Sequence, residues 1–187
     1  IVRVNEQGER IPLTIADSSK ELGTITLVIQ EAGYSSGLLV RLEVGQSILD
    51  VTGPLGHPSQ IDQNRTVVFV GGGLGIAPIY PIAKAYKAAG NKVITILGAR
   101  NKALLIWKEK LESVSDEVLI ATDDGSLGHK GLVTEVLKDL IAQKKIDKIV
   151  AIGPHAMMHA VSKVVPENIE LVVSLNAIMV DGTGMCG

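Results

Sequence analysis

Residues 66–80, TVVFVGGGLGIAPIY, decide the fold of this chain. The first five are β-branched or aromatic, and so short an apolar run is typical of a buried strand. The run breaks into a glycine-rich stretch, and a helical pattern follows with Pro78 and Pro81 in its first turns. Proline is tolerated there because the first N–H groups of a helix have no partner within the helix. The stretch predicts a strand, a glycine turn and a helix.

Such a turn is how an α/β sheet builds a site for a nucleotide diphosphate. Glycine lets the ligand approach the backbone, and the free N–H groups at the helix start face the phosphates. The spacing GGGxGxAP differs from the GxGxxG of the ordinary dinucleotide fingerprint. Taken alone, the turn is equally compatible with a purely structural tight turn.

Composition narrows the class of protein. The 187 residues suffice for one large domain or two small ones. No apolar run reaches the ~18 residues of a membrane span. The net charge of −2 argues against a nucleic-acid partner. The single cysteine excludes an internal disulfide and fits a reducing cytoplasm. Because the chain begins at Ile1 and stops within an apparent loop, we expect sequence to be missing at both ends.

The first third of the chain is β-rich. Strands are expected at residues 1–4, 10–15, 24–30 and 47–51, and a turn at GPLG, residues 53–56. Ser35 or Ser36 can cap a short helix that ends near Leu42. The polar residues 62–65 are interpreted as a hinge.

The rest of the chain alternates strands with helices, which predicts a parallel sheet with right-handed crossovers. Strands are expected at residues 92–97, 117–121, 147–152 and 169–173, and helices at 77–89, 102–111, 131–143 and about 155–164. The predicted buried side chains of the second and third helices are Leu104, Leu105, Trp107 and Leu111, and Leu132, Val136, Leu137 and Leu140. Four loops should meet at the carboxyl edge of this sheet, where ligands bind: residues 71–75, 98–100, 122–126 and 153–154.

Four motifs occur in the order found in one family: GGGLGIAP, TDDGSLGHKGLVT, IGPHAMM and SLNAIMVDGTGMCG. The chain resembles the flavoprotein reductases of ferredoxin–NADP reductase type along essentially its whole length. The nearest branch holds the electron-transfer subunit of dihydroorotate dehydrogenase, sulfide dehydrogenase and the small subunit of ferredoxin:NADP oxidoreductase. The resemblance implies α/β plus all-β architecture: an incomplete FAD-binding β-barrel at residues 1–64, a doubly wound NAD(P)-binding sheet at 65–174, and the start of a [2Fe–2S] segment at 175–187.

The resemblance also implies flavin contacts. Thr14 matches the hydroxyl beside the reactive nitrogen of the flavin, and Leu13 replaces the aromatic residue of the motif. Ile11 stands where the motif has arginine, and Arg10 is one residue early, so Arg10 is either a phosphate contact or a solvated charge. The remaining FAD-binding positions implied are Pro12, Gly33, Ser35, Ser36, Gly53 and Pro54. Residues 33–36 could instead serve only as a helix N-cap, and Gly53 and Pro54 could form only a structural turn.

The implied NAD(P)H contacts lie on the four loops: Gly71, Gly72, Gly73, Gly75, Ile76, Pro78, Arg100, Asp123, Asp124, Gly125, Gly153 and Pro154. Carboxylates at 123 and 124 would repel a 2′-phosphate and accept hydrogen bonds from a ribose diol, so NADH is favoured over NADPH. Arg100 keeps NADPH open, and the aspartates could instead cap the next turn. His155, His159, Met157 and Met158 are interpreted as helix surface and core rather than metal ligands.

The last motif departs from the dihydroorotate-type pattern. Asp181 occupies the place of the first cluster cysteine and Cys186 that of the second. One cysteine cannot hold an iron–sulfur cluster. Either Asp181 and Cys186 ligate a [2Fe–2S] cluster together with thiolates beyond this sequence, or the loop is a tight turn.

The resemblance implies that NADH delivers hydride to FAD, with Thr14 as the orienting residue, and that electrons pass through the cluster to a larger flavoprotein or iron–sulfur subunit, with ferredoxin as a further possible partner. The alternatives are a dihydroorotate dehydrogenase electron-transfer subunit and, from another class, a dinucleotide-binding sensor without flavin. No nucleic-acid binding or membrane insertion is expected.

Overall fold

The computed structural model describes residues 1–175, which form two compact units, Ile1–Pro58 and Ser59–Leu175. The boundary expected between residues 64 and 65 lies a few residues inside the second unit. The assignment of the first unit to a flavin stays a prediction.

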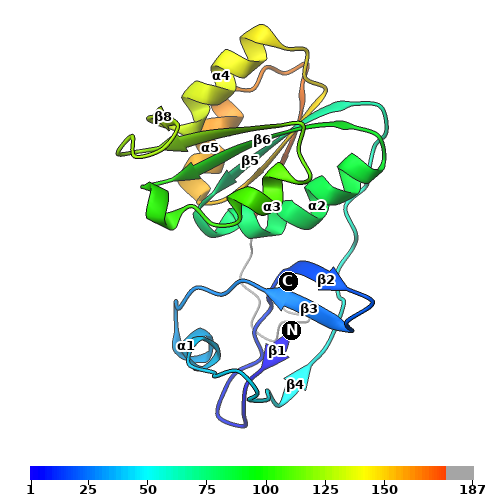
Figure 1. Ribbon diagram of the computed structural model, residues 1–187, viewed down its shortest axis with the longest axis vertical. Coiled ribbons are helices and arrows are strands. Elements are labelled where there is room, and N and C mark those ends of the chain that lie inside the picture. The colour runs from blue at the N-terminus through cyan, green and yellow to red at the C-terminus, as the bar shows by residue number, and fades with distance from the viewer. Residues whose placement is uncertain (176–187) are drawn as a thin grey trace. The chain divides into compact units, whose positions relative to one another are not determined.

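The second unit is built on a six-stranded sheet in the order β10-β9-β5-β6-β7-β8 (Figure 1). Every neighbouring pair is parallel. The predicted strands are confirmed with small shifts at their ends, and their bounds are β5 Thr66–Gly72, β6 Lys92–Ala99, β7 Glu117–Thr122, β9 Lys148–Ile152 and β10 Glu170–Val173. The two-residue strand β8, His129–Lys130, lies in a segment where no strand was expected.

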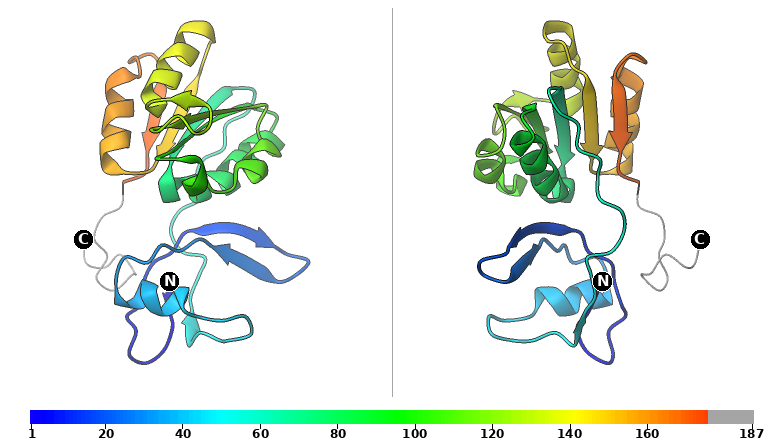
Figure 2. Two further views of the ribbon diagram at one scale, coloured as in Figure 1. Left: turned by 60° about the vertical axis from the view of Figure 1, so that its left-hand side comes forward. Right: turned by 90° about the vertical axis from the view of Figure 1, so that its right-hand side faces the viewer.

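Helices cover both faces of this sheet, as Figures 1 and 2 show. One face carries α2 (Ile76–Ala88) and α3 (Lys108–Glu112), and the other carries α4 (Val133–Gln143) and α5 (His155–Val164). The predicted doubly wound sheet is therefore confirmed. In the described part of the chain, the core on the α4 and α5 face has no aromatic residue, whereas the core on the α2 and α3 face includes Phe69, Tyr80 and Tyr86. The strands, buried on both faces, take mainly β-branched residues; Val67, Val68 and Ile94 are fully buried.

The first unit is small and all-β apart from one helix. β1 (Val2–Arg3) pairs antiparallel with β4 (Asp50–Val51), and β2 (Ile15–Ser19) pairs antiparallel with β3 (Thr24–Leu27). The helix α1 spans Tyr34–Val40. Among residues 1–58 these two-stranded sheets do not close a barrel, which agrees with the expected incomplete barrel.

The helix expected at residues 102–111 is wrong. A 3₁₀ turn, η2 (Lys102–Leu104), is followed by an extended Leu105, and α3 begins only at Lys108. Trp107 interrupts the helix with a left-handed φ of 55°. Its ring packs edge-on against Tyr80 of α2, with centroids 5.7 Å apart, so a contact across 27 positions overrides the helical spacing. Leu111 is buried as predicted, whereas Leu104 is 44% exposed.

Two other local predictions also fail. The helix expected from residue 131 begins at Val133, and Leu132 lies outside it, extended and 58% exposed. Its N–H donates to Oε2 of Glu135, which closes the first turn of α4. In the first unit, Gly33 rather than a serine is the N-cap of α1.

Candidate functional site

The four predicted loops meet at the carboxyl edge of the six-stranded sheet. β5 lies between β6 and β9, and the chain leaves β5 toward one side of the sheet and β9 toward the other. This reversal makes a topological switch point, where the loops diverge and open α/β sheets bind ligands. The glycine turn after β5 and the loop after β9 flank that point, because Gly71 is in register with Ile152.

These two loops interlock backbone to backbone. A Cβ atom on Gly75 would lie 2.3 Å from the carbonyl oxygen of Ile152. One on Gly153 would lie 3.1 Å from the backbone of Gly72, and one on Gly72 would collide with the Met157 sulfur. The side chains of Ile76 and Ile79 fill the space that a Cβ atom on Gly71 would take. Gly71 therefore allows α2 to pack closely on β5. Gly72 and Gly75 allow β5 and the turn after it to approach α5 and the end of β9.

Gly73 is different from its neighbours. It has a left-handed φ of 54°, and nothing lies within 4 Å of the position its Cβ would take. It opens η1 (Gly73–Gly75), which runs directly into α2 at the fully buried Ile76. Pro78 follows at the third position of α2, so its missing N–H leaves no intrahelical bond unmade. Gly73 thus provides open space and exposed backbone at the start of a helix, which suits an anionic ligand.

Hydrogen bonds connect the loops after β6 and β7. The N–H groups of Asp123 and Asp124 donate to the carbonyls of Ala99 and Arg100, both at 3.2 Å. The N–H of Lys102 donates to Oγ of Ser126 at 2.8 Å. The structure therefore brings Arg100 and the two aspartates to the same part of the edge.

The two aspartates are not equivalent. Oδ1 of Asp124 accepts a 2.9 Å bond from the N–H of Ser126, and hydrogen bonds from Ser126 lower the pKa of Asp124 below its ordinary value of 3.8. Within residues 1–175, neither the Asp123 carboxylate nor the Arg100 guanidinium makes a hydrogen bond or an ion pair. Asp124 thus shapes the loop, while Asp123 and Arg100 are available to a ligand.

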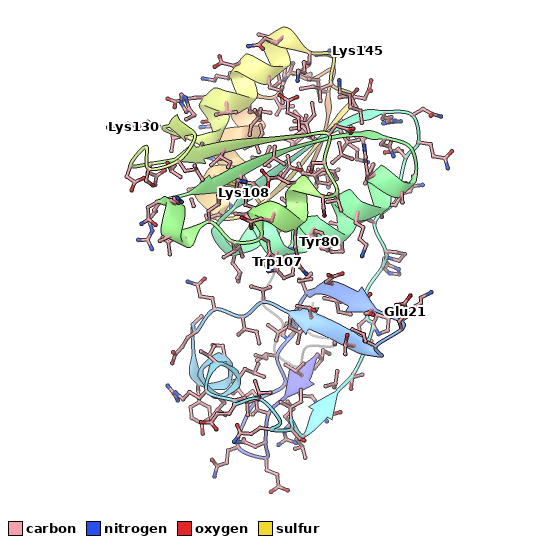
Figure 3. All side chains as sticks on the ribbon, viewed as in Figure 1. Glu21, Tyr80, Trp107, Lys108, Lys130 and Lys145 are labelled. Carbon is pink, nitrogen blue, oxygen red and sulfur yellow. The ribbon has the colours of Figure 1, made fainter. Side chains whose placement is uncertain are left out.

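Thr122 and residues near it stabilise the loop after β7. The fully buried Thr122 hydroxyl donates to the carbonyl of Leu127 at 2.8 Å and accepts from its N–H at 3.1 Å. Gly125 has a φ of 75°, and its missing side chain leaves room for the stem of Lys130, which Figure 3 labels on β8. Sequence reasoning did not single out Thr122 or Ser126. The only available signal was their hydroxyls beside an Asp-Asp-Gly turn, which is a common turn composition.

In the first unit, the residues expected at the flavin motif lie on the stretch before β2. Thr14 is exposed, and Pro12 and Leu13 are partly buried. The Arg10 guanidinium pairs with Asp50 at 3.0 Å, with 54% of the arginine side chain exposed. Gly53 and Pro54, joined by a cis peptide bond, form an exposed loop after β4.

The start of α1 adjoins an open pocket of about 410 Å³ lined by Glu31, Ala32, Gly33, Tyr34, Gly37 and Arg41. Nothing lies within 4 Å of a Cβ on Gly33. Both predicted serines serve the backbone: Ser35 Oγ accepts from the N–H of Glu9, and Ser36 Oγ accepts from the N–H groups of Ala32 and Gly33. The first-turn N–H groups of α1 have no partner within the helix, so the backbone rather than the hydroxyls is open to an anion.

The metal positions predicted at Asp181 and Cys186 lie outside the described residues. Within residues 1–175 no three His, Cys, Asp or Glu side chains gather in a way that could hold a metal ion. His155 and His159 are exposed on α5, with parallel rings 6.5 Å apart. Among the same residues, no helix combines the length and apolarity that crossing a bilayer requires.

The parallel sheet, its switch point and the glycine turn define a nucleotide-binding α/β domain of the kind found in oxidoreductases. Residues 69–163 match the model of the family described as "Oxidoreductase NAD-binding domain". The chain belongs to this family and, by its relatives, to the ferredoxin–NADP reductase-like flavoproteins.

The relatives cover both units. A Thermotoga maritima protein named as a homolog of the electron transfer subunit of dihydroorotate dehydrogenase B (NAD(+)) is 48% identical over 188 residues, which is 100% of this chain and 66% of the relative. The corresponding Fusobacterium nucleatum subunit is 31% identical, covering 99% of this chain and 73% of its own length. The chain thus spans about two thirds of the length of the Thermotoga relative.

Solved structures also match both units. The structure of an NADH-dependent reduced ferredoxin–NADP oxidoreductase, described in connection with flavin-based electron bifurcation, matches 100% of this chain and 67% of its own with 45% identity and a TM-score of 0.90. The cytochrome b5 reductase domain of Ulva prolifera nitrate reductase matches 93% of this chain and 81% of its own with 16% identity and a TM-score of 0.67, a likeness of fold alone.

Proposed function

We propose that this protein is an electron-transfer flavoprotein subunit that takes electrons from a nicotinamide dinucleotide and passes them to a partner subunit, as in ferredoxin:NADP oxidoreductase or sulfide dehydrogenase. The observation that carries the proposal is the match of both units at once, 100% of the chain at 45% identity, to an NADH-dependent ferredoxin–NADP oxidoreductase. The chain is then an oxidoreductase subunit whose catalysis depends on its cofactors.

The residues at the switch point fit a dinucleotide. Gly73 provides open space, and the free N–H groups where η1 runs into α2 suit a pyrophosphate. Gly71, Gly72, Gly75 and Gly153 would contribute indirectly, because they let the loops close around that space. Pro154 and the N-terminus of α5 border the same edge.

The available Asp123 carboxylate supports NADH over NADPH. A carboxylate accepts hydrogen bonds from a ribose diol and repels a 2′-phosphate. Asp124 and Gly125 would hold the loop in shape, because Asp124 already bonds to Ser126. Arg100, on the adjacent loop, would attract the phosphates of either dinucleotide.

The first unit fits FAD at two places. Gly33 and the N–H groups of the first turn of α1 suit a phosphate, with Ser35 and Ser36 in supporting roles. Exposed Thr14, beside Pro12 and Leu13, would donate its hydroxyl to a ring nitrogen. Bound flavin supplies the exchange between two-electron and one-electron transfer, and the protein sets its position and potential.

We further propose that Asp181 and Cys186 belong to a [2Fe–2S] site completed by thiolates that the 187 residues do not contain. The sequence pattern around Cys186 is the support for this step. Iron and sulfide content of the full-length protein, with and without Cys186→Ser, would test it: loss of iron in the variant supports the ligand role, and equal iron in both contradicts it.

Specific observations also support two other functions. The names of the Thermotoga and Fusobacterium relatives favour an electron-transfer subunit of dihydroorotate dehydrogenase. A dinucleotide-binding sensor without flavin is favoured by Arg10, which pairs with Asp50 instead of standing in the motif position.

The deciding experiment is anaerobic visible absorption of the full-length protein before and after one equivalent of NADH. Bleaching of a flavin band followed by loss of a cluster band supports the proposed reductase. Bleaching with NADPH but not with NADH contradicts the role given to Asp123. Protein purified without air that has no visible bands would favour the sensor. Dihydroorotate as an added electron donor, with the partner subunit present, separates the dihydroorotate alternative.

A further inference from the structure

Residues 59–65, where the chain enters the second unit, are held to that unit by hydrogen bonds between their backbone atoms and two buried side chains. The Tyr86 hydroxyl donates to the carbonyl of Gln60 at 2.9 Å, and the Asn91 side-chain amide donates to the carbonyl of Asp62 at 2.7 Å. The N–H of Arg65 donates to the Asn91 oxygen at 3.0 Å. Tyr86 and Asn91 are 1% and 4% exposed, so they are rigid anchors. The hinge expected at residues 62–65 is therefore wrong.

A buried lysine adds a second fastening. Nζ of Lys148 lies 3.0 Å from Asp62 and 2.9 Å from Glu170, and its side chain is 9% exposed. The Arg65 guanidinium lies 3.0 Å from the second carboxylate oxygen of Glu170. A poorly solvated cation loses much of its stabilisation when a carboxylate partner is withdrawn. The Asp62–Lys148 pair thus resists detachment of the segment.

Residues 53–58, GPLGHP, have the opposite character. Every one of them is exposed. Among the described residues, none of the six makes a hydrogen bond or an ion pair. Gly56 has a φ of 82° with nothing within 4 Å of a Cβ, so packing does not hold it. Segments with few contacts and solvent-exposed backbone open at low free-energy cost.

We infer that, where the chain first passes from one unit to the other, the pivot is residues 53–58, and that the Asp62–Lys148 pair makes residues 59–65 a fixed part of the nucleotide-binding unit. On this passage, backbone movement is then confined to six residues. The inference goes beyond the proposed function, since it does not depend on which cofactors the units hold.

Amide hydrogen exchange of the full chain, followed by mass spectrometry, tests this directly. The amide of Arg65, whose N–H donates to Asn91, should exchange at least about tenfold more slowly than the amides of residues 53–58, which have no hydrogen-bond partner among the described residues. In Lys148→Met, exchange at Arg65 should accelerate while β5 stays protected. Lys163→Met, at an exposed position on α5, is the matched control and should change nothing. Equal exchange of the Arg65 amide and of the amides in 53–58 in the unmodified protein would overturn the inference.

Insertions give an independent test that does not rely on removing a charge. Two glycines inserted after His57 should leave the melting temperature of the nucleotide-binding unit unchanged. The same insertion after Gln63 should lower it, because Asp62 and Arg65 can no longer meet their partners together. If both insertions are tolerated equally, or if the first is the more damaging, the pivot is not at residues 53–58.

Discussion

Gly75 and the carbonyl oxygen of Ile152 approach so closely that a Cβ atom on Gly75 would lie 2.3 Å from that oxygen. The obstacle is backbone at the end of β9, which cannot move aside as a flexible side chain can. We expect Gly75→Ala to lower the free energy of unfolding by about 1–3 kcal/mol, as overpacking does, and to weaken dinucleotide binding. Urea denaturation and fluorescence titration with NADH measure the two effects.

Gly73→Ala is the comparison for Gly75→Ala. No atom lies within 4 Å of a Cβ on Gly73, so the variant meets only the penalty of a left-handed alanine, about 1 kcal/mol. If Gly73→Ala is the more destabilising of the two, the backbone approach does not determine this turn.

Thr122→Val should loosen the nucleotide loop. Valine keeps the shape of the buried side chain but leaves the N–H and carbonyl of Leu127 without their partner, at a cost of about 1–3 kcal/mol. NADH affinity should fall as well, because Asp123 is the next residue. Thr95→Val is the matched control: Thr95 is equally buried and bonds to Ser115 at 2.8 Å, outside the loop after β7. Equal losses of NADH affinity in both variants would contradict a specific role for Thr122.

Asp123 and Asp124 should differ in dinucleotide selectivity. Asp123→Asn should weaken NADH binding about tenfold, equivalent to ~1.4 kcal/mol, and Asp123→Ser should also improve NADPH binding by removing the negative charge. Asp124→Asn should change little, since an amide oxygen can still accept the N–H of Ser126. Dissociation constants from isothermal titration, with the exposed Asp139→Asn as control, measure this.

An Asp124→Asn variant that loses as much NADH affinity as Asp123→Asn would refute the separate roles of the two aspartates. A wild-type protein that binds neither dinucleotide would refute the proposed function itself, so the two failures are distinguishable.

Asp116 should make stability fall at low pH. The Lys87 ammonium at 2.5 Å and the N–H of Val93 at 2.8 Å favour the ionised carboxylate, and they lower the pKa of Asp116 below its ordinary 3.8. As the pH falls, the unfolded chain takes up the proton first, so the stabilisation is complete above pH 3.8 and disappears as the pH drops through the folded pKa. The stability advantage of wild type over Asp116→Asn should therefore shrink below pH 3.8 in urea titrations. An advantage that stays constant down to acid unfolding would argue against this ion pair.

Much of the second unit could be predicted because its information is local. The β-branched run at residues 66–70 and the glycines after it specify a strand and a turn without reference to other parts of the chain. Alternation of such strands with amphipathic helices restricts the topology to a parallel sheet, so convergence of the four loops at one edge followed from the order of elements.

The errors occurred where distant contacts outweighed local preference. Trp107 has good helical spacing, but it packs on Tyr80 with a left-handed backbone, and α3 begins only after it. Residues 62–65 have the composition of a flexible linker, and partners 24 to 105 positions away hold them. Strand β8 consists of two residues, too few to produce a periodic pattern.

The sequence by itself determined the class of fold and the edge at which a dinucleotide would bind, because strand, turn and helix signals act over a few neighbouring residues. The tertiary structure alone decided that most glycines of the turn are packing residues, that Asp124 is engaged while Asp123 is available, and that the linker is anchored by Lys148. Each of these depends on which atoms meet across the fold, and side chains of one type have the same local propensity whether or not a distant partner reaches them.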